Sequence, residues 1–323
     1  MTKKSQTLFL LLAFSLFFIP GLSKDDKTIP NTEKHSQADN TTYTPKETGK
    51  LFLWKVTSEK TTLHLLGSIH LAKKELYPLD KAIEDAYSDS DNIVVELDAT
   101  DPKVAAQSQM LVMQKGLDMS GSVANLLEPK EITKLKELLP PEIPFATAEK
   151  LKPWLLAMSV EVELVKKAGY KKQYGIDKYF IDKAKIDKKT LLALEQPADQ
   201  INAISGGSSD EQKQHLKNTV NDSDKVSEGM KTMFELWNKG DASGLYQISV
   251  TDSIKKNPYM KDYLKRLSFD RNLKMLEKIE GYLKTGKKYF VIVGSLHTVG
   301  KEGLAQLLKD KGYTVTQAEK TKK

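Results

Sequence analysis

Short apolar runs of the kind that form buried strands alternate along the chain with longer segments of helical spacing. Apolar runs at 51–56 and 61–66 are separated by polar residues near 58–60, which predicts a hairpin. A segment with helical spacing follows at 78–87, with a proline at its start, and then a short apolar strand at 93–97. The order of strand, helix and strand predicts a βαβ unit.

The C-terminal part of the chain repeats this order. A strand is predicted at 289–293, followed by a helix through Leu304, Leu307 and Leu308. Gly312 is suited to end that helix, and a last strand is predicted at 313–316.

Most of the sequence between these two units has helical character. A helix with a proline in its first turn is predicted at 153–167, and its apolar positions are expected to form core. A further helix is expected to start near Ile176 and to lead into a strand at 190–194. From 198 to 288 helices are predicted, interrupted by the loop at 206–209 and by Gly240. The chain therefore belongs to the α/β class.

The N-terminal residues predict export. Two lysines precede a mostly apolar stretch and then small residues, so residues 1–23 are expected to be a signal peptide. The apolar stretch is shorter than the roughly 20 residues that cross a bilayer, so membrane attachment is expected only through an uncleaved signal. Residues 24–49 predict a flexible polar linker, and residues 50–320 a single domain with helical insertions.

Composition narrows the chemistry. The chain has no cysteine, which excludes disulfides, thiolate ligands and a cysteine nucleophile, so any metal would be held by nitrogen and oxygen. The net charge of +7 comes from scattered lysines without a basic stripe, and we expect no nucleic-acid partner. Only Arg266 and Arg271 are arginines.

The tetrapeptide Gly-Ser-x-His occurs twice, ending at His70 and at His297, and each copy follows an apolar run. Glycine at a strand end allows a tight turn, after which a histidine can project into the crevice at the carboxyl ends of the strands. Two such histidines are suited to bind one divalent metal ion, here Mn, Co or Zn, with a carboxylate completing the site. The alternative for each copy is a strand-to-helix turn that the serine caps.

Other residues are candidates on weaker grounds. Glu96 and Glu195 lie at predicted strand ends, where a functional carboxylate and a solvated strand end are both open interpretations. Arginine at position 271 suggests planar, bidentate hydrogen bonding, although a surface position is the alternative. We expect Ser68 and Ser295 to be caps or hydrogen-bond donors beside the site, because the sequence implies no base for either.

The two remaining histidines of the predicted domain are expected to lie outside the site. His64 alternates with apolar neighbours in its strand and is expected to be packed or at the surface. His215 lies in a polar segment and is expected to face solvent.

These motifs resemble the TraB/GumN family, which includes the pheromone-shutdown protein PrgY and the animal TIKI proteases and is distantly similar to the ChaN and EreA folds. The resemblance extends over about residues 51–316. Its matching pieces are Gly67-Ser68-Ile69-His70, Glu96, Leu151-Lys152-Pro153-Trp154, Tyr174-Gly175-Ile176-Asp177, Leu194-Glu195-Gln196, Arg271-Asn272 with Met275, and Gly294-Ser295-Leu296-His297 with Gly300 and Gly303.

The resemblance implies an α/β domain with a central mixed sheet flanked by helices, similar to ChaN, EreA and TIKI, with the motifs on the two βαβ units. It also implies a divalent-metal-dependent hydrolase that acts on a peptide or protein, and the predicted signal peptide leads us to expect this hydrolase in the periplasm or secreted. Carried onto this chain, the metal ligands would be His70, His297 and Glu96, and the catalytic residues Glu96 and Arg271. Residues expected beside the ligands or substrate are Ser68, Asp177, Glu195, Asn272 and Ser295. The alternative is a non-catalytic envelope protein of the same fold that binds a peptide or haem.

Overall fold

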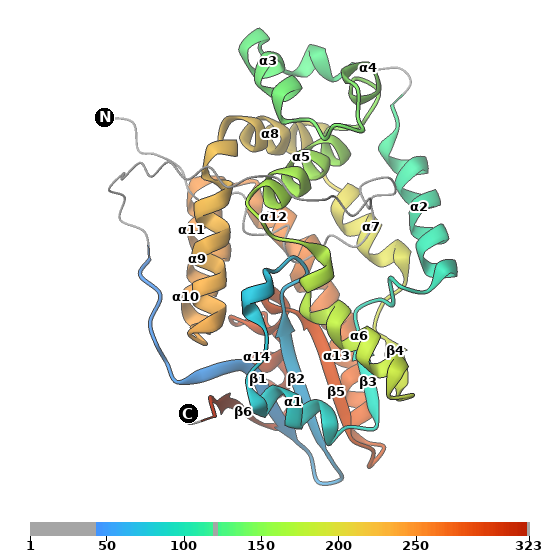
Figure 1. Cartoon of the computed structure of the whole chain (residues 1–323), viewed down its shortest axis with the longest axis vertical. Helices are drawn as coiled ribbons and strands as arrows, with labels where there is room; N and C mark the ends of the chain where they lie inside the picture. Colours follow the sequence, from blue (N-terminus) through green and yellow to red (C-terminus); the bar gives the residue numbers. More distant parts are fainter. Residues whose placement is uncertain (1–42, 119–121, 322–323) are drawn as a thin grey trace.

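The computed structural model describes residues 43–118 and 122–321, which fold around one six-stranded sheet (Figure 1). The strand order is β4-β3-β5-β2-β1-β6. The strands are β1 (Lys50–Thr57), β2 (Thr62–Ser68), β3 (Asn92–Val95), β4 (Thr190–Ala193), β5 (Tyr289–Gly294) and β6 (Thr314–Glu319).

The sheet is mixed. Four neighbouring strands, β4, β3, β5 and β2, are parallel, whereas β1 runs antiparallel to both β2 and β6. The predicted hairpin of β1 and β2 is present, with Val56 opposite Leu63. The α/β class with a mixed sheet flanked by helices is therefore confirmed.

In neither of the two strand-helix-strand units are the two strands neighbours in the sheet. β2 and β3 are parallel, but β5 lies between them and pairs with both. β5 and β6 are separated by β2 and β1. The consequence is that β2 and β5, which carry the two Gly-Ser-x-His motifs, become direct neighbours, an arrangement that periodicity within each unit did not indicate.

Fourteen α-helices lie in the described residues. They are α1 (Lys81–Ser88), α2 (Pro102–Gly116), α3 (Pro129–Leu138), α4 (Phe145–Ala148), α5 (Pro153–Lys167), α6 (Ile176–Ile186), α7 (Pro197–Ser205), α8 (Ser209–Asn221), α9 (Val226–Asn238), α10 (Ala242–Tyr246), α11 (Asp252–Lys256), α12 (Met260–Leu264), α13 (Asp270–Leu283) and α14 (Leu304–Asp310). Two π-helical segments, η6 (Gln247–Thr251) and η7 (Lys265–Phe269), join α10 to α11 and α12 to α13. The 3-10 segment η8 (Ser295–Thr298) follows β5.

Aromatic side chains show which helices cover which face of the sheet. Phe290 of β5 packs edge-on against Tyr87 of α1 and Phe180 of α6. The next residue back, Tyr289, stacks on Tyr282 of α13. Because successive side chains of a strand point to opposite faces, α1 and α6 cover one face and α13 the other.

Most of the remaining helices gather beyond the carboxyl ends of the parallel strands, with α3, α4, α5 and α8 farthest from the β1–β2 turn, whereas α14 lies beside the sheet and contacts β6 and α13 (Figure 1). The helix predicted at 153–167 is observed at those residues, and α6 begins at Ile176 as expected. This helical cap closes over the edge of the sheet where the two motifs end, so residues that follow the strands are buried.

The signal peptide predicted at 1–23 and residues 24–42 of the predicted linker lie outside the described residues. The described end of the linker is attached to the domain. Tyr43 donates to Asp241 at 2.9 Å, and the backbone N–H of Thr48 donates to the carbonyl of Lys239 at 3.1 Å. None of the helices within 43–118 and 122–321 combines the length and the apolar character needed to span a bilayer.

Candidate functional site

The two Gly-Ser-x-His motifs lie side by side at the ends of β2 and β5. In the parallel register Gly67 is opposite Val293 and Ser68 opposite Gly294. The hydroxyl of Ser295 donates to the carbonyl of Ser68 at 2.8 Å and so joins the two motifs. A Cβ on Gly67 would stand 3.1 Å from the backbone of Ser295, so glycine permits this close approach.

His297 is buried, at 2% exposure, and its ring is oriented by Asn272 of α13. The side-chain nitrogen of Asn272 donates to the carbonyl of Glu302 at 2.7 Å, which turns its oxygen Oδ1 toward His297. Nδ1 of His297 lies 2.6 Å from that oxygen and therefore carries the proton that it donates. Nε2 is left with its lone pair, and it lies 3.7 Å from Oε1 of Glu96.

The environment of His297 keeps the ring neutral. Burial lowers the pKa of His297 well below its usual value, and the positive charge of Arg271 lowers it further. The negative charge of Glu195 raises the pKa of His297 but does not offset these two effects. At neutral pH the ring is thus an uncharged imidazole with a defined tautomer, which is the form that ligates metals or accepts a proton.

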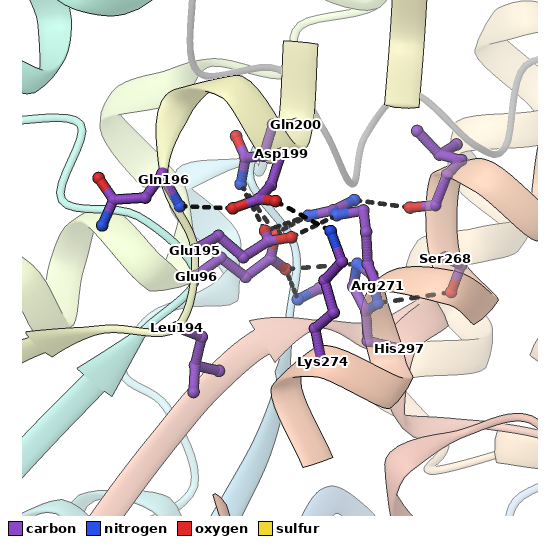
Figure 2. Close-up of polar contacts among 12 residues, drawn as sticks. Glu96, Leu194, Glu195, Gln196, Asp199, Gln200, Ser268, Arg271, Lys274 and His297 are labelled. Carbon is purple, nitrogen blue, oxygen red and sulfur yellow. Dashed lines mark hydrogen bonds and ion pairs between the residues drawn. The ribbon is translucent and has the colours of Figure 1, made fainter. Parts of the chain in front are cut away.

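Arg271 joins the two glutamates (Figure 2). Its Nε donates to Oε1 of Glu195 at 2.7 Å and its Nη2 to Oε2 of the same residue at 2.6 Å, which makes a bidentate pair. Nη2 also reaches Oε2 of Glu96 at 2.7 Å. Nη1 donates to the carbonyl of Leu267 in the π-helical segment η7, at 2.6 Å. The planar fork expected from the choice of arginine is therefore observed, and the surface alternative is wrong.

The charges in this cluster are strongly coupled. Burial alone would lower the pKa of Arg271, but the charges of Glu195 and then Glu96 outweigh burial and raise the pKa above its usual value. All three side chains are buried. The guanidinium is consequently a permanent cation that fixes both carboxylates relative to β5 and α13.

Two further donors complete the hydrogen bonding of the carboxylates, and neither was predicted from the sequence. Gln200 of α7 donates to Oε2 of Glu96 at 3.2 Å and to Oε2 of Glu195 at 3.1 Å (Figure 2). The backbone N–H of Gly294 donates to Oε1 of Glu96 at 2.6 Å. Each of the four carboxylate oxygens of Glu96 and Glu195 thus accepts at least one hydrogen bond.

His70 lies beside Asp177, which is in the first turn of α6. Nδ1 of His70 is 2.9 Å from Oδ1 of Asp177, and both side chains are buried. The turn is held by the backbone, because the N–H of Ile176 donates to the carbonyl of Ile69 at 3.0 Å. A Cβ on Gly175 would stand 2.4 Å from the carbonyl oxygen of His70, so only glycine allows α6 to start there.

A small cavity connects the His70 side of the site with the Glu96 side. Its volume is about 10 Å³, near the minimum that accommodates one water molecule. The cavity is lined by His70, Val95, Glu96, Leu97, Asp177, Gln200 and Ile292. Polar groups from the segment after β3, from α6 and α7 and from the first motif therefore meet at this cavity.

The structure brings most of the predicted site residues into one buried region, but as two sets. Glu96, Glu195, Arg271, Asn272 and His297 form one connected cluster of hydrogen bonds and close contacts, and His70 with Asp177 borders the cavity beside it. Within 43–118 and 122–321, no three side chains of His, Asp or Glu stand close enough together to hold a metal ion. The expected ligand set of His70, His297 and Glu96 is therefore not assembled.

The prediction that His215 faces solvent is wrong. His215 is 5% exposed, its Nε2 lies 3.3 Å from Oε1 of Glu161, and its ring stacks on Tyr263. His215 lies on α8 and faces α5. Because α8 is otherwise mostly polar, its sequence predicts an exposed segment. His215 lies outside the site, as expected.

Two comparisons with known proteins gave matches. Residues 52–317 match the model of the TraB/PrgY/gumN family. An uncharacterized protein named YbaP from Escherichia coli K12 is 24% identical over 246 residues, which cover 76% of this chain and 87% of that protein. The protein of the same name from Shigella flexneri matches to the same extent. No solved structure matches.

Proposed function

Because the chain belongs to the TraB/PrgY/gumN family, we propose that it is an exported divalent-metal-dependent hydrolase that acts on peptide bonds. The proposal includes the finer fold likeness to ChaN, EreA and TIKI that the sequence motifs imply. The observation that supports it best is an excess of buried negative charge at the paired histidine motifs.

The charge excess follows from the formal charges around the cavity. Glu96, Glu195 and Asp177 contribute three carboxylates, all buried, and Arg271 is the one guanidinium in contact with them. The three carboxylates thus outnumber the single guanidinium that contacts them. Lys172 also interacts with Asp177, and because its side chain is exposed at the surface its charge offsets that of Asp177 only in part. Uncompensated buried charge is unfavourable, and a divalent cation would neutralise it.

The donor chemistry fits such an ion. His297 presents the lone pair of Nε2, and Asn272 holds the opposite nitrogen in the manner typical of metal-binding histidines. Nitrogen and carboxylate oxygen together suit Zn, Mn or Co. In the proposal His70, His297 and Glu96 hold the ion, and their side chains move together when it binds, since they are not grouped around one point beforehand.

A bound divalent ion would polarise a substrate carbonyl and lower the pKa of a bound water to about 7. The chain's own groups would do the rest. Glu96 accepts a proton from water, and its carboxylate is held in position for this by the N–H of Gly294 and by Arg271. Arg271 stabilises negative charge that develops beside Glu96.

Substrate needs a route to this site. The cavity of about 10 Å³ accommodates water but no part of a peptide. Two of its walls are Asp177 at the start of α6 and Gln200 on α7. The proposal therefore requires these helix ends to move apart when substrate binds.

A second candidate function is binding of a peptide or haem without catalysis. It is favoured by the hydrogen bonding of the carboxylates, because every oxygen of Glu96 and Glu195 already accepts a hydrogen bond, as in a structural ion-pair network.

Purified protein, freed of metal and then supplied with Mn, Co or Zn, separates these functions in a diverse peptide library. Metal-dependent cleavage that is lost in Glu96→Gln and kept in Arg266→Lys supports the hydrolase. Arg266 pairs with Glu211 outside the site and provides the matched control. Retention of peptides or haem without cleavage supports the binding function. If the protein neither cleaves nor retains peptides or haem with any of the three metals, both proposed functions are contradicted.

Export is part of the proposal and rests on residues 1–23. Cell fractionation and N-terminal sequencing of the mature protein test it. A cytoplasmic protein that keeps its first 23 residues would contradict export.

A further inference from the structure

A groove of about 600 Å³ lies outside the buried site, on the helical part of the domain. Its lining residues come from α10, η6, α11, α12, η7 and α13, from the segment before α14, and from α14 itself through Leu307. This volume is in the range of pockets that hold small organic ligands. Nothing in the proposed hydrolysis uses the groove.

The lining of the groove is largely apolar. Val250, Ile254, Phe269, Leu273 and Leu307 contribute side chains to it. Leu273 is 54% exposed, and it is one of four large apolar residues in the described ranges that are strongly exposed. Leu273 therefore extends the apolar surface of the groove to solvent.

The charges at the rim leave one cation without a partner. Lys265 pairs with Asp270 at 2.5 Å, and Lys301 lies 3.6 Å from Glu302, whose other oxygen accepts from Tyr246 at 3.0 Å. Lys261 also lines the groove, and its ammonium forms no hydrogen bond or ion pair with residues 43–118 or 122–321. The groove therefore combines an apolar surface with a single available positive charge.

We propose that this groove binds a monoanionic amphiphile, an aliphatic chain that carries one carboxylate, such as a medium-chain fatty acid. The chain lies against Phe269 and Leu273, and the carboxylate pairs with the ammonium of Lys261. A dianion or a larger acidic segment would meet Asp270 and Glu302 on the same rim and be repelled. An uncharged or cationic chain would leave Lys261 without a partner.

The groove adjoins the buried site but is chemically separate from it. Glu302 lines the groove, and its carbonyl holds Asn272, which orients His297. Lys261 and Leu273 touch none of these groups by hydrogen bond or ion pair. Amphiphile binding therefore can be measured on metal-free protein, and its outcome is independent of whether the protein hydrolyses peptides.

Isothermal titration calorimetry of the metal-free protein with dodecanoate, below its critical micelle concentration, tests the proposal. We expect saturable binding at one site, and octanoate to bind at least tenfold more weakly, since each buried methylene contributes about fourfold in affinity. Dodecyltrimethylammonium, with the same chain and the opposite charge, is expected to bind at least tenfold more weakly than dodecanoate.

Variants locate the site. Lys261→Glu should weaken dodecanoate binding at least tenfold, and Leu273→Asp should do the same by placing a charge where the chain lies. Lys255→Glu is the matched control, because Lys255 is an exposed lysine of α11 that does not line the groove. It should bind as the wild type does.

The proposal is overturned by absence of dodecanoate binding, by equal loss in Lys261→Glu and Lys255→Glu, or by equal affinity for the anionic and cationic chains. An apolar peptide with a free C-terminal carboxylate that binds more tightly than dodecanoate would overturn the assignment to an aliphatic chain. Circular dichroism of each variant before titration shows that the variant is folded.

Discussion

The ring nitrogen Nδ1 of His297 lies 2.6 Å from the side-chain oxygen of Asn272, and this contact fixes which nitrogen of the ring remains available. The amide of Asn272 cannot turn over without losing its bond to the carbonyl of Glu302. Nε2, on the side of Glu96, is therefore the nitrogen that takes part in any chemistry.

Asn272→Ala is expected to weaken metal binding about 10–100-fold, because the ring of His297 loses its orienting acceptor. Asn272→Asp keeps an acceptor at this position and should retain most of the affinity. Titration of metal-free protein with Zn or Mn measures the dissociation constant. Asn218→Ala is the control, since Asn218 bonds to Asn257 and Tyr259 outside the site. Equal metal affinity in Asn272→Ala and wild type would contradict the orienting role of Asn272.

Arg271→Met is expected to lower the free energy of unfolding by about 3–5 kcal/mol, because two buried carboxylates lose their cation. Arg271→Lys should cost less, since it keeps the charge and loses the bidentate geometry. Urea unfolding in the presence of a chelator measures both. Arg266→Lys, at the less buried pair with Glu211, should cost only about 1 kcal/mol. Similar losses at the two arginines would argue against a special role for the Arg271 cluster.

A second buried pair joins α5 to α8. Glu161 is 1% exposed and accepts from Thr219 at 2.7 Å, beside His215. Glu161→Ala leaves these polar groups without their acceptor and is expected to cost about 3 kcal/mol in unfolding free energy. Glu163→Ala, on the same helix at a longer contact with Lys167, should cost less than about 1 kcal/mol. Thermal or urea unfolding distinguishes them, and a small loss for Glu161→Ala would show that the pair contributes little.

His64 predicts a pH dependence of stability. Burial lowers the pKa of His64 below its unfolded value of 6.5; Asp89 opposes the effect, and Lys55 and Lys288 add to it. As the pH falls through 6.5, the unfolded state binds more protons at this residue than the folded state does. The stability that His64 contributes as a neutral side chain is therefore fully present above pH 6.5 and is lost as the pH falls below it. The slope is at most about 1.4 kcal/mol per pH unit, and less for a partly exposed group.

His64→Gln should therefore unfold with a flatter dependence on pH than the wild type. The free energy of unfolding in urea, measured at pH 8 and at about pH 5.5, gives the comparison. Between these two pH values the free energy of unfolding should change less in His64→Gln than in the wild type. Parallel curves for both would show that His64 does not titrate differently on folding.

Much of the fold and of the candidate site could be predicted from the sequence because the relevant signals are local. The apolar runs before His70 and His297 gave the strands, and the glycines gave the turns after them. Glu96, Glu195 and Arg271 were selected by position and residue type, and all three are in one cluster. The two glutamates are brought together by the parallel pairing of β3 with β4, after which the N–H of Glu195 donates to the carbonyl of Glu96 at 2.9 Å.

The partners that were missed are set by contacts between distant segments. Gln200 bonds to Glu96 from 104 positions away, and nothing in the spacing of α7 marks it. The proline that starts α7 is the signal that could have placed a helix start next to Glu195 and so Gln200 near it. His215 was misjudged because a polar helix can bury one residue against a charged partner on another helix.

The central claim, that His70 and His297 hold a divalent ion, is tested most directly by metal content. Wild type, His70→Ala/His297→Ala and the control His64→Ala are incubated with Mn, Co or Zn, dialysed and measured by elemental analysis. We expect about one equivalent of one metal in the wild type and the control, and none in the double variant. Equal metal in all three proteins, or none in the wild type with any of the three ions, would contradict the account.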